Sequence, residues 1–248
     1  MTNNKHNVAH DWSDITYDQK LMPSQPFFSE LFQDTDVTFE QAMMQAALKT
    51  GGDKIPAEKY DLEFSPDMPV QLMGSNPTAL SFLQSLVLLH KPQTILEIGT
   101  FIGLSAIYMA SALPEGGKLT SLEKYDSFAE IARGNIARNG LGGRVEVIAG
   151  DASKTLPELQ DRRFDMAFVD GHKEAYADYL DLIDPLVPVG GLIITDDIFF
   201  HGDALNSPPR TEKGAGVKRF MDKVAGMENY HRCVMPMSNG ILLMIKRS

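Results

Sequence analysis

Three aspartates follow two apolar stretches that have the pattern of neighbouring strands in a parallel sheet. Asp170 comes directly after residues 164–169, and Asp196 and Asp197 come directly after residues 191–195. The carboxyl ends of such strands meet at one edge of the sheet, where three carboxylates repel one another unless they are protonated or bridged by a cation. Oxygen ligands without histidine or thiolate favour a hard cation, Mg²⁺ first, with Mn²⁺ or Ca²⁺ as substitutes. Asp170, Asp196 and Asp197 are therefore the predicted metal ligands.

Lys173 follows Asp170 by three residues, at the start of the next predicted helix, so its amine can reach a substrate oxygen beside the ion. A nearby cation lowers the pKa of a lysine, which makes a proton-accepting amine available near physiological pH. Lys173 and Asp170 are the predicted catalytic residues. His172 and His201 lie in adjoining segments, and their roles are left open.

A glycine-containing loop, residues 99–103 (GTFIG), follows the first predicted strand, where an open parallel sheet binds its ligands. Glycine lets the backbone approach a ligand closely, and the next helix presents free N–H groups. At the end of the second strand, Glu123 can accept both hydroxyls of a ribose. A dinucleotide fingerprint would need glycine where Phe101 and Leu104 stand, and no phosphate-binding G-x-x-x-x-G-K-[ST] run is present, so a different nucleoside cofactor is indicated.

The elements that must position these residues alternate between strand and helix, which specifies a doubly wound, mostly parallel sheet with helices on both faces. A capped helix runs from Asn76 to about His90. Strands are predicted at 94–98, 118–122, 144–148, 164–169, 191–195, 230–235 and 241–246, and further helices at 105–113, 128–139, 153–159, 175–186 and 214–224. Residues 238–240 (SNG) have the pattern of a hairpin turn between the last two strands.

Residues 1–60 lack this alternation and contain one predicted helix, with Thr38 as its cap and Gly51-Gly52 as its stop. We predict a helical amino-terminal extension that serves as a lid or dimer arm. The remaining residues, 61–248, are predicted to form one domain.

The composition is that of a globular protein, with 43% hydrophobic and 23% charged residues. The net charge of -10 disfavours binding to nucleic acid or an anionic membrane. Neither a signal peptide nor a span of the roughly 20 apolar residues that cross a bilayer is found. The single cysteine, Cys233, suits a reducing compartment, so a cytoplasmic location is expected.

Five motifs, taken together and in order, resemble the metal-dependent class I O-methyltransferases, which include catechol and caffeoyl-coenzyme A O-methyltransferases and many bacterial relatives. They are ILEIGTFIGLSA (95–106), LTSLEKY (119–125), GDA (150–152), FDMAFVDGHKEAY (164–176) and GGLIITDD (190–197). The resemblance covers about residues 70–247. It implies a Rossmann-like methyltransferase fold with seven strands and an antiparallel last strand, S-adenosylmethionine as cofactor, and a homodimer that uses the amino-terminal segment.

The resemblance also assigns residues to parts of the cofactor. Glu97 and Gly99 would line its methionine end, Ser105 would bind its carboxylate, Glu123 its ribose, and Asp151 with Ala152 its adenine. Thr100, Phe101, Gly103 and Asp170 complete the predicted cofactor site. Asp151 also has the position of a helix cap. Lys173 corresponds to the family's general base, whereas Asp197 departs from the usual Asp-Asn pair and adds a negative charge.

The acceptor is predicted to be a small, catechol-like aromatic molecule, because residues 198–215 form a loop at the ligand edge and contain Phe199, Phe200 and Pro208-Pro209. One alternative within the transferases is a wobble 5-hydroxyuridine of tRNA, which the acidic charge disfavours. Alternatives from other classes are an NAD-dependent oxidoreductase and a protein that binds S-adenosylmethionine without catalysis.

Overall fold

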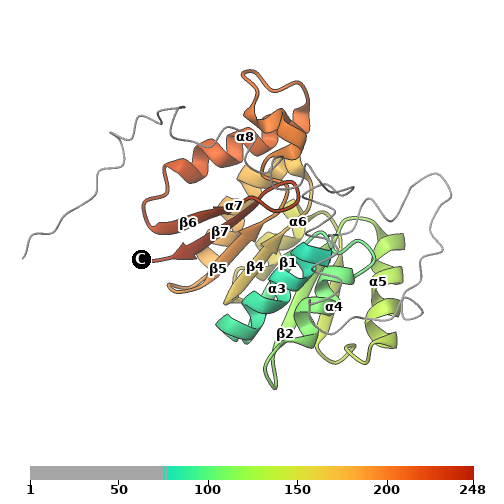
Figure 1. Ribbon diagram of the computed structural model, residues 1–248. Coiled ribbons are helices and arrows are strands. Elements are labelled where there is room, and N and C mark those ends of the chain that lie inside the picture. Colours follow the sequence, from blue (N-terminus) through green and yellow to red (C-terminus); the bar gives the residue numbers. More distant parts are fainter. Residues whose placement is uncertain (1–74, 76) are drawn as a thin grey trace, which may run out of the picture. The chain divides into compact units, whose positions relative to one another are not determined.

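The computed structural model describes residue 75 and residues 77–248 as a seven-stranded sheet with helices on both faces (Figure 1). The strand order is β3-β2-β1-β4-β5-β7-β6. The first five strands are parallel, and β7 runs antiparallel to both β5 and β6. The strands are β1 (Thr94–Ile98), β2 (Lys118–Glu123), β3 (Val145–Ala149), β4 (Met166–Val169), β5 (Leu192–Thr195), β6 (Tyr230–Met235) and β7 (Ile241–Lys246). The predicted fold class is confirmed.

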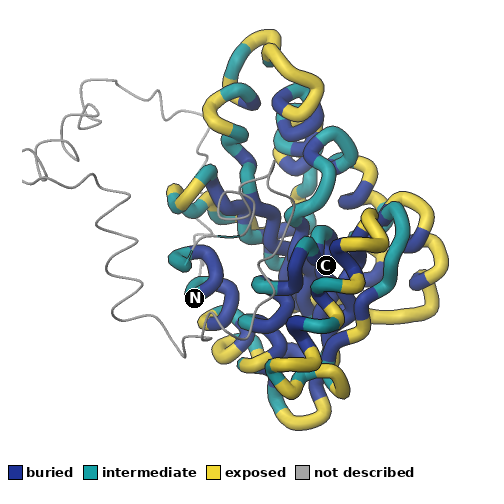
Figure 2. Tube along the Cα trace, turned by 90° about the vertical axis from the view of Figure 1, so that its right-hand side faces the viewer, coloured by how far each residue is buried: buried dark blue, intermediate teal, exposed yellow. Residues whose placement is uncertain are grey.

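Successive residues of the central strands pack into two different cores, because side chains of a strand alternate between the faces of the sheet. On β1, Leu96 and Ile98 join the core under the helices within residues 152–225, and Ile95 joins the core under the helices within residues 77–138. In Figure 2 these central segments are dark blue and the connecting loops at the rim are largely yellow. Helices thus cover both faces of the central strands, whereas the loops at the strand ends are more exposed.

The helices follow the predicted positions. They are α3 (Pro77–His90), α4 (Leu104–Ser111), α5 (Asp126–Arg138), α6 (Ala152–Thr155), α7 (Tyr176–Ile183) and α8 (Glu212–Ala225). Of these, α4, α6 and α7 are shorter than predicted, and α5 and α8 are slightly longer. Single 3-10 turns replace the ends of two predicted helices, namely η4 (Leu156–Leu159) after α6, and η5 (Lys173–Ala175) and η6 (Asp184–Leu186) on either side of α7. Proline in the first turn of η4 and of η6 explains two of these breaks, since proline lacks the N–H that a continuing helix needs. The loop after β5 contains a 3-10 segment, η7 (Phe200–Leu205), which was not predicted.

The predicted extension 1–60, its helix after Thr38 and the Asn76 cap lie outside the described residues. Within the described part of the chain, no helix combines the length and the apolar character that a membrane crossing requires.

Candidate active site

Hydrogen bonds between strand ends bring the predicted acids to one edge of the sheet. The backbone N–H of Asp170 donates to the carbonyl of Ile98 at 2.9 Å, and that of Asp196 donates to Val169 at 3.0 Å. Gly99 has a φ of +98°, and a Cβ at this position would collide with the carbonyl oxygen of Asp170. Glycine is therefore required where the loop 99–103 contacts the end of β4.

Glu97 lies at the base of this edge and is completely buried. Its carboxylate accepts hydrogen bonds from the hydroxyls of Ser105, at 2.6 Å, and Ser121. Ser121 also shares a 2.5 Å hydrogen bond with Thr100. Burial raises the pKa of Glu97 to about 7, although the two serine hydroxyls act in the opposite direction. The predicted partner of a cofactor carboxylate, Ser105, thus holds Glu97 in this structure.

The carboxylate of Glu123 holds the two loops that adjoin it. It accepts from the backbone N–H of Phe101 at 2.7 Å and from that of Tyr125 at 3.0 Å. The phenyl ring of Phe128 makes edge contacts with the rings of Phe101 and Tyr125. Burial raises the pKa of Glu123, against the effect of the backbone N–H donors. Gly103, with a φ of +89°, caps the start of α4 at the other end of the loop.

Asp151 caps α6 by accepting from the N–H of Ser153 at 3.0 Å, and Ala152 is the buried first residue of that helix. The ammonium of Lys124 lies 3.5 Å from the Asp151 carboxylate and 3.2 Å from Nε2 of His172. Lys124 and His172 therefore connect the loops after β2, β3 and β4 on the side where the resemblance places the adenine.

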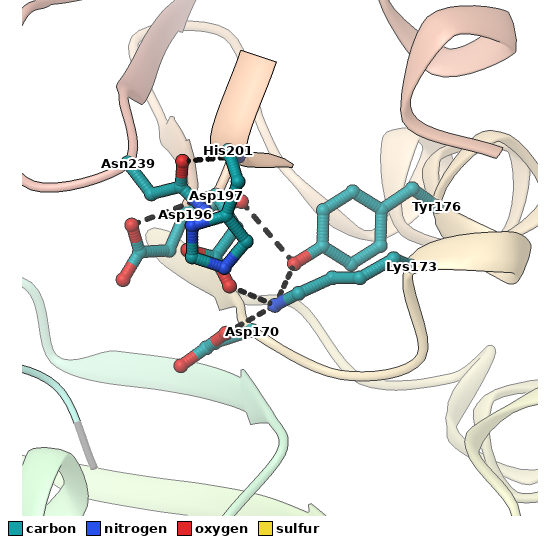
Figure 3. A network of polar contacts seen from close by, with 7 residues as sticks. All are labelled: Asp170, Lys173, Tyr176, Asp196, Asp197, His201 and Asn239. Carbon is teal, nitrogen blue, oxygen red and sulfur yellow. Dashed lines mark hydrogen bonds and ion pairs between the residues drawn. The ribbon is translucent and has the colours of Figure 1, made fainter. Parts of the chain in front are cut away.

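Asp170, Asp196 and Asp197 form an acidic cluster around the ammonium of Lys173 (Figure 3). The ammonium lies 2.6 Å from Oδ1 of Asp170 and 2.7 Å from Oδ2 of Asp197, and it donates to the hydroxyl of Tyr176 at 2.8 Å. Burial alone would lower the pKa of Lys173, but Asp170, Tyr176 and Asp197 together raise it well above its usual value. The sequence-based expectation of a lowered pKa does not apply to this arrangement, because the nearest charges are carboxylates.

Asp196 is buried beside this ion pair. Its carboxylate accepts from the backbone N–H of Asp197 at 2.7 Å. Burial, followed by repulsion from Asp170 and Asp197, raises the pKa of Asp196 to about 7. Desolvation likewise raises the pKa of Asp170. Burial and repulsion thus disfavour the charged forms of Asp170 and Asp196, even with the Lys173 ammonium beside them.

The acidic cluster has the donor chemistry for a hard cation, and its raised pKa values indicate that another positive charge would stabilise it. Within residues 75 and 77–248, however, no three His, Cys, Asp or Glu side chains already stand in an arrangement that holds a metal. Lys173 instead lies between two of the proposed ligands, Asp170 and Asp197.

Two residues of this network, Tyr176 and Asn239, were not predicted as site residues from the sequence. Tyr176 is completely buried, and its hydroxyl donates to the carbonyl of Asp196 at 3.2 Å. Its spacing of three residues from Lys173 was a usable signal, since such residues adjoin on a helix. Asn239 donates to Asp197 at 3.0 Å and was interpreted only as part of a turn. The ring of His201 packs on Phe200, while its backbone bonds to Asn239.

Comparison with known proteins assigns the chain to a family. A family model described as O-methyltransferase matches residues 61–247. A catechol O-methyltransferase from Niastella koreensis is 36% identical over 148 residues, which cover 58% of this chain and 67% of the relative. The chain therefore belongs to the O-methyltransferase family, and this prediction is confirmed.

Two solved structures extend the likeness to most of the chain. The O-methyltransferase from Bacillus cereus, solved in complex with SAH, has a TM-score of 0.70 at 25% identity, covering 90% of this chain and 96% of its own. TomG from Streptomyces achromogenes, an O-methyltransferase of tomaymycin synthesis solved with SAM, has a TM-score of 0.67 at 29% identity, covering 90% and 95%. Both support a methyltransferase fold for the described residues.

Proposed function

We propose that this protein transfers the methyl group of S-adenosylmethionine to a hydroxyl of a small aromatic acceptor that carries two adjacent oxygens. The observation that carries the proposal is that the glycine loop, residues 99–103, contacts the acidic cluster around Lys173. Gly99 of the loop adjoins Asp170 of the cluster. A donor bound on the loop and an acceptor bound at the cluster would be neighbours, and such proximity is the main requirement of a two-substrate transfer.

The donor side of the site consists of the loop 99–103 and the two buried glutamates. Glu123, at the end of β2, is proposed to accept the ribose hydroxyls, and Glu97 to face the methionine end. Asp151 and Ala152 are proposed to line the adenine. The bound SAM and SAH of the two related structures support this choice of donor.

The acceptor side consists of Asp170, Asp196 and Asp197, which are proposed to hold a divalent ion, Mg²⁺ by preference. When bound, the ion would supply a positive charge that stabilises the anion of a chelated hydroxyl and relieves the repulsion among the three carboxylates. An acceptor with two adjacent oxygens suits such a site. The name of the Niastella koreensis relative, catechol O-methyltransferase, agrees with this acceptor class.

Lys173 is proposed to accept the hydroxyl proton at Nζ. The Tyr176 hydroxyl orients the amine, because it accepts from Lys173 and donates its own proton to the carbonyl of Asp196. Burial favours the neutral amine once Asp170 and Asp197 no longer face it as free charges. The acceptor oxygen then forms a bond to the methyl carbon as the carbon–sulfur bond breaks, which leaves a thioether.

The test is a methyl-transfer assay with labelled S-adenosylmethionine against catechols, hydroxycinnamoyl thioesters and tRNA, each with and without EDTA. We expect transfer to an acceptor with adjacent hydroxyls, loss of transfer in EDTA, and recovery with Mg²⁺. A matched monophenol, which cannot chelate, serves as the control acceptor. Transfer at the same rate with and without EDTA would refute the need for a divalent ion. Transfer to tRNA alone would refute a small aromatic acceptor.

A further inference from the structure

Asn239 lies in the turn between β6 and β7, and both halves of its amide contact the loop that follows β5 (Figure 3). Its Nδ2 donates to Oδ1 of Asp197 at 3.0 Å, and its Oδ1 accepts from the backbone N–H of His201 at 2.6 Å. The other oxygen of Asp197 contacts Lys173. We infer that Asn239 is a positioning residue of the proposed reaction, acting through Asp197; this inference rests on the function proposed above.

Backbone hydrogen bonds also attach the turn between β6 and β7 to the loop that follows β5. The N–H groups of Ile198 and Phe199 donate to the carbonyls of Gly240 and Asn239, at 3.0 and 2.9 Å. Gly240 has a φ of +87°, and a Cβ there would overlap the ring of Phe199. The hairpin and the loop are therefore fitted closely to each other.

The attached loop is held in a conformation that its residues rarely adopt alone. Asp197, Phe200 and His201 have φ values of 60°, 42° and 54°. Non-glycine residues with positive φ persist where surrounding contacts impose them, and such sites are often functional. Asn239 bonds to two of these three residues, so its amide is one of the contacts that impose the conformation.

An amide is the side chain that this position needs. A single amide donates to the Asp197 carboxylate and accepts from the His201 N–H in the same orientation. Aspartate at 239 could still accept from His201, but it would place a second carboxylate against Asp197. The penalty of Asn239→Asp should therefore depend on the charge at position 197.

The experiment is a double-mutant cycle with wild type, Asn239→Asp, Asp197→Asn and the double variant, assayed for kcat, KM and cofactor affinity with Mg²⁺ present. In the wild-type background, Asn239→Asp should lower kcat on the order of 10- to 100-fold and leave cofactor affinity unchanged. In the Asp197→Asn background, the same change should cost little, because the amide at 197 can donate to the new carboxylate. Asn229→Asp, at an amide that contacts the carbonyl of Ser248, is the matched control.

Hydrogen exchange of residues 196–205 gives a second measurement that does not depend on turnover. Asn239→Asp should accelerate exchange there, and Asp197→Asn should restore slow exchange in the double variant. Equal kcat penalties in both backgrounds would show that Asn239 acts independently of Asp197 and would overturn the inference. Unchanged exchange would overturn it whether or not the protein is active, whereas an inactive wild type with the expected exchange pattern would refute only the proposed function.

Discussion

The amino edge of the sheet, where the parallel strands begin, differs from the carboxyl edge, where they end. At the amino edge, Arg162 donates to Glu146 at 2.7 Å, and this hydrogen bond lowers the pKa of that carboxyl group. At the carboxyl edge, Asp196 is buried against Asp170 and Asp197, and its pKa is raised to about 7, with burial as the largest cause. At the amino edge a carboxylate thus faces a positive charge, whereas at the carboxyl edge a buried carboxyl group faces two other acidic side chains. Carboxylates with raised pKa values in a cluster are characteristic of functional sites, which supports the proposal that the chemistry takes place at the carboxyl edge.

The amino edge also contains a cavity of about 470 Å³, whose lining includes Thr120, Arg144 and Arg162. The guanidinium of Arg144 donates to the carbonyls of Ala110, Leu113 and Pro114, and so holds the end of α4 and the turn after it. Arg144 thus bonds to the backbone, whereas Arg162 bonds to the side chains of Thr120 and Glu146. A hollow of this size does not by itself indicate a ligand site.

Lys173→Met tests the carboxyl edge and should have the largest effect. Removing the proton acceptor should lower kcat about 10²- to 10⁴-fold, the usual contribution of general acid–base catalysis, with little change in cofactor affinity. Single-turnover methyl transfer and calorimetry measure the two quantities. Lys218→Met is the matched control, because Lys218 also pairs with an aspartate, Asp222, but on the exposed side of α8. A kcat for Lys173→Met equal to that of the control would exclude Lys173 as the base.

Asp165→Ala tests the amino edge. One carboxylate oxygen of Asp165 accepts from the backbone N–H groups of Gln93 and Thr94, at 2.7 and 3.1 Å, and from the Thr94 hydroxyl at 3.2 Å. Leaving these donors unpaired should lower the free energy of unfolding by about 1–3 kcal/mol. Urea unfolding measures this loss, while kcat should remain that of the wild type. A large fall in kcat without a loss of stability would contradict the assignment of this edge to structure.

The positions of the acids could be predicted because they depend on local patterns. Each apolar strand ends one residue before Asp170 or Asp196, and a parallel sheet brings such ends together. Asn239 could not be found in this way. It reaches Asp197 from 42 residues further along the chain, and only because antiparallel β7 lies between β5 and β6.

The charge state of Lys173 could not be predicted from the sequence either. Its pKa direction depends on whether carboxylates or a cation lie nearest, and spacing along the chain does not determine those distances. The predicted helix 153–159 likewise divides into α6 and η4, where proline interrupts the helix. The roles given to residues 97–105, 123, 151 and 152 remain predictions.

Glu97→Gln tests the smallest expected effect, which is a dependence of stability on pH. The pKa of Glu97 is raised from 4.5 to about 7, so between these values the folded protein retains a proton that the unfolded chain has lost. The stabilisation is therefore complete below pH 4.5 and is lost as the pH rises through 7. The free energy of unfolding of wild type minus that of Glu97→Gln should fall by about 1 kcal/mol between about pH 5.5 and 6.5.

Urea unfolding of both proteins at each pH measures this difference, and the subtraction removes the contribution of Asp196, which both proteins share. A constant difference across this range would mean that the buried carboxylate ionises normally. The mismatch of charge at the carboxyl edge would then be confined to the Lys173 cluster and would not extend to the base of the glycine loop.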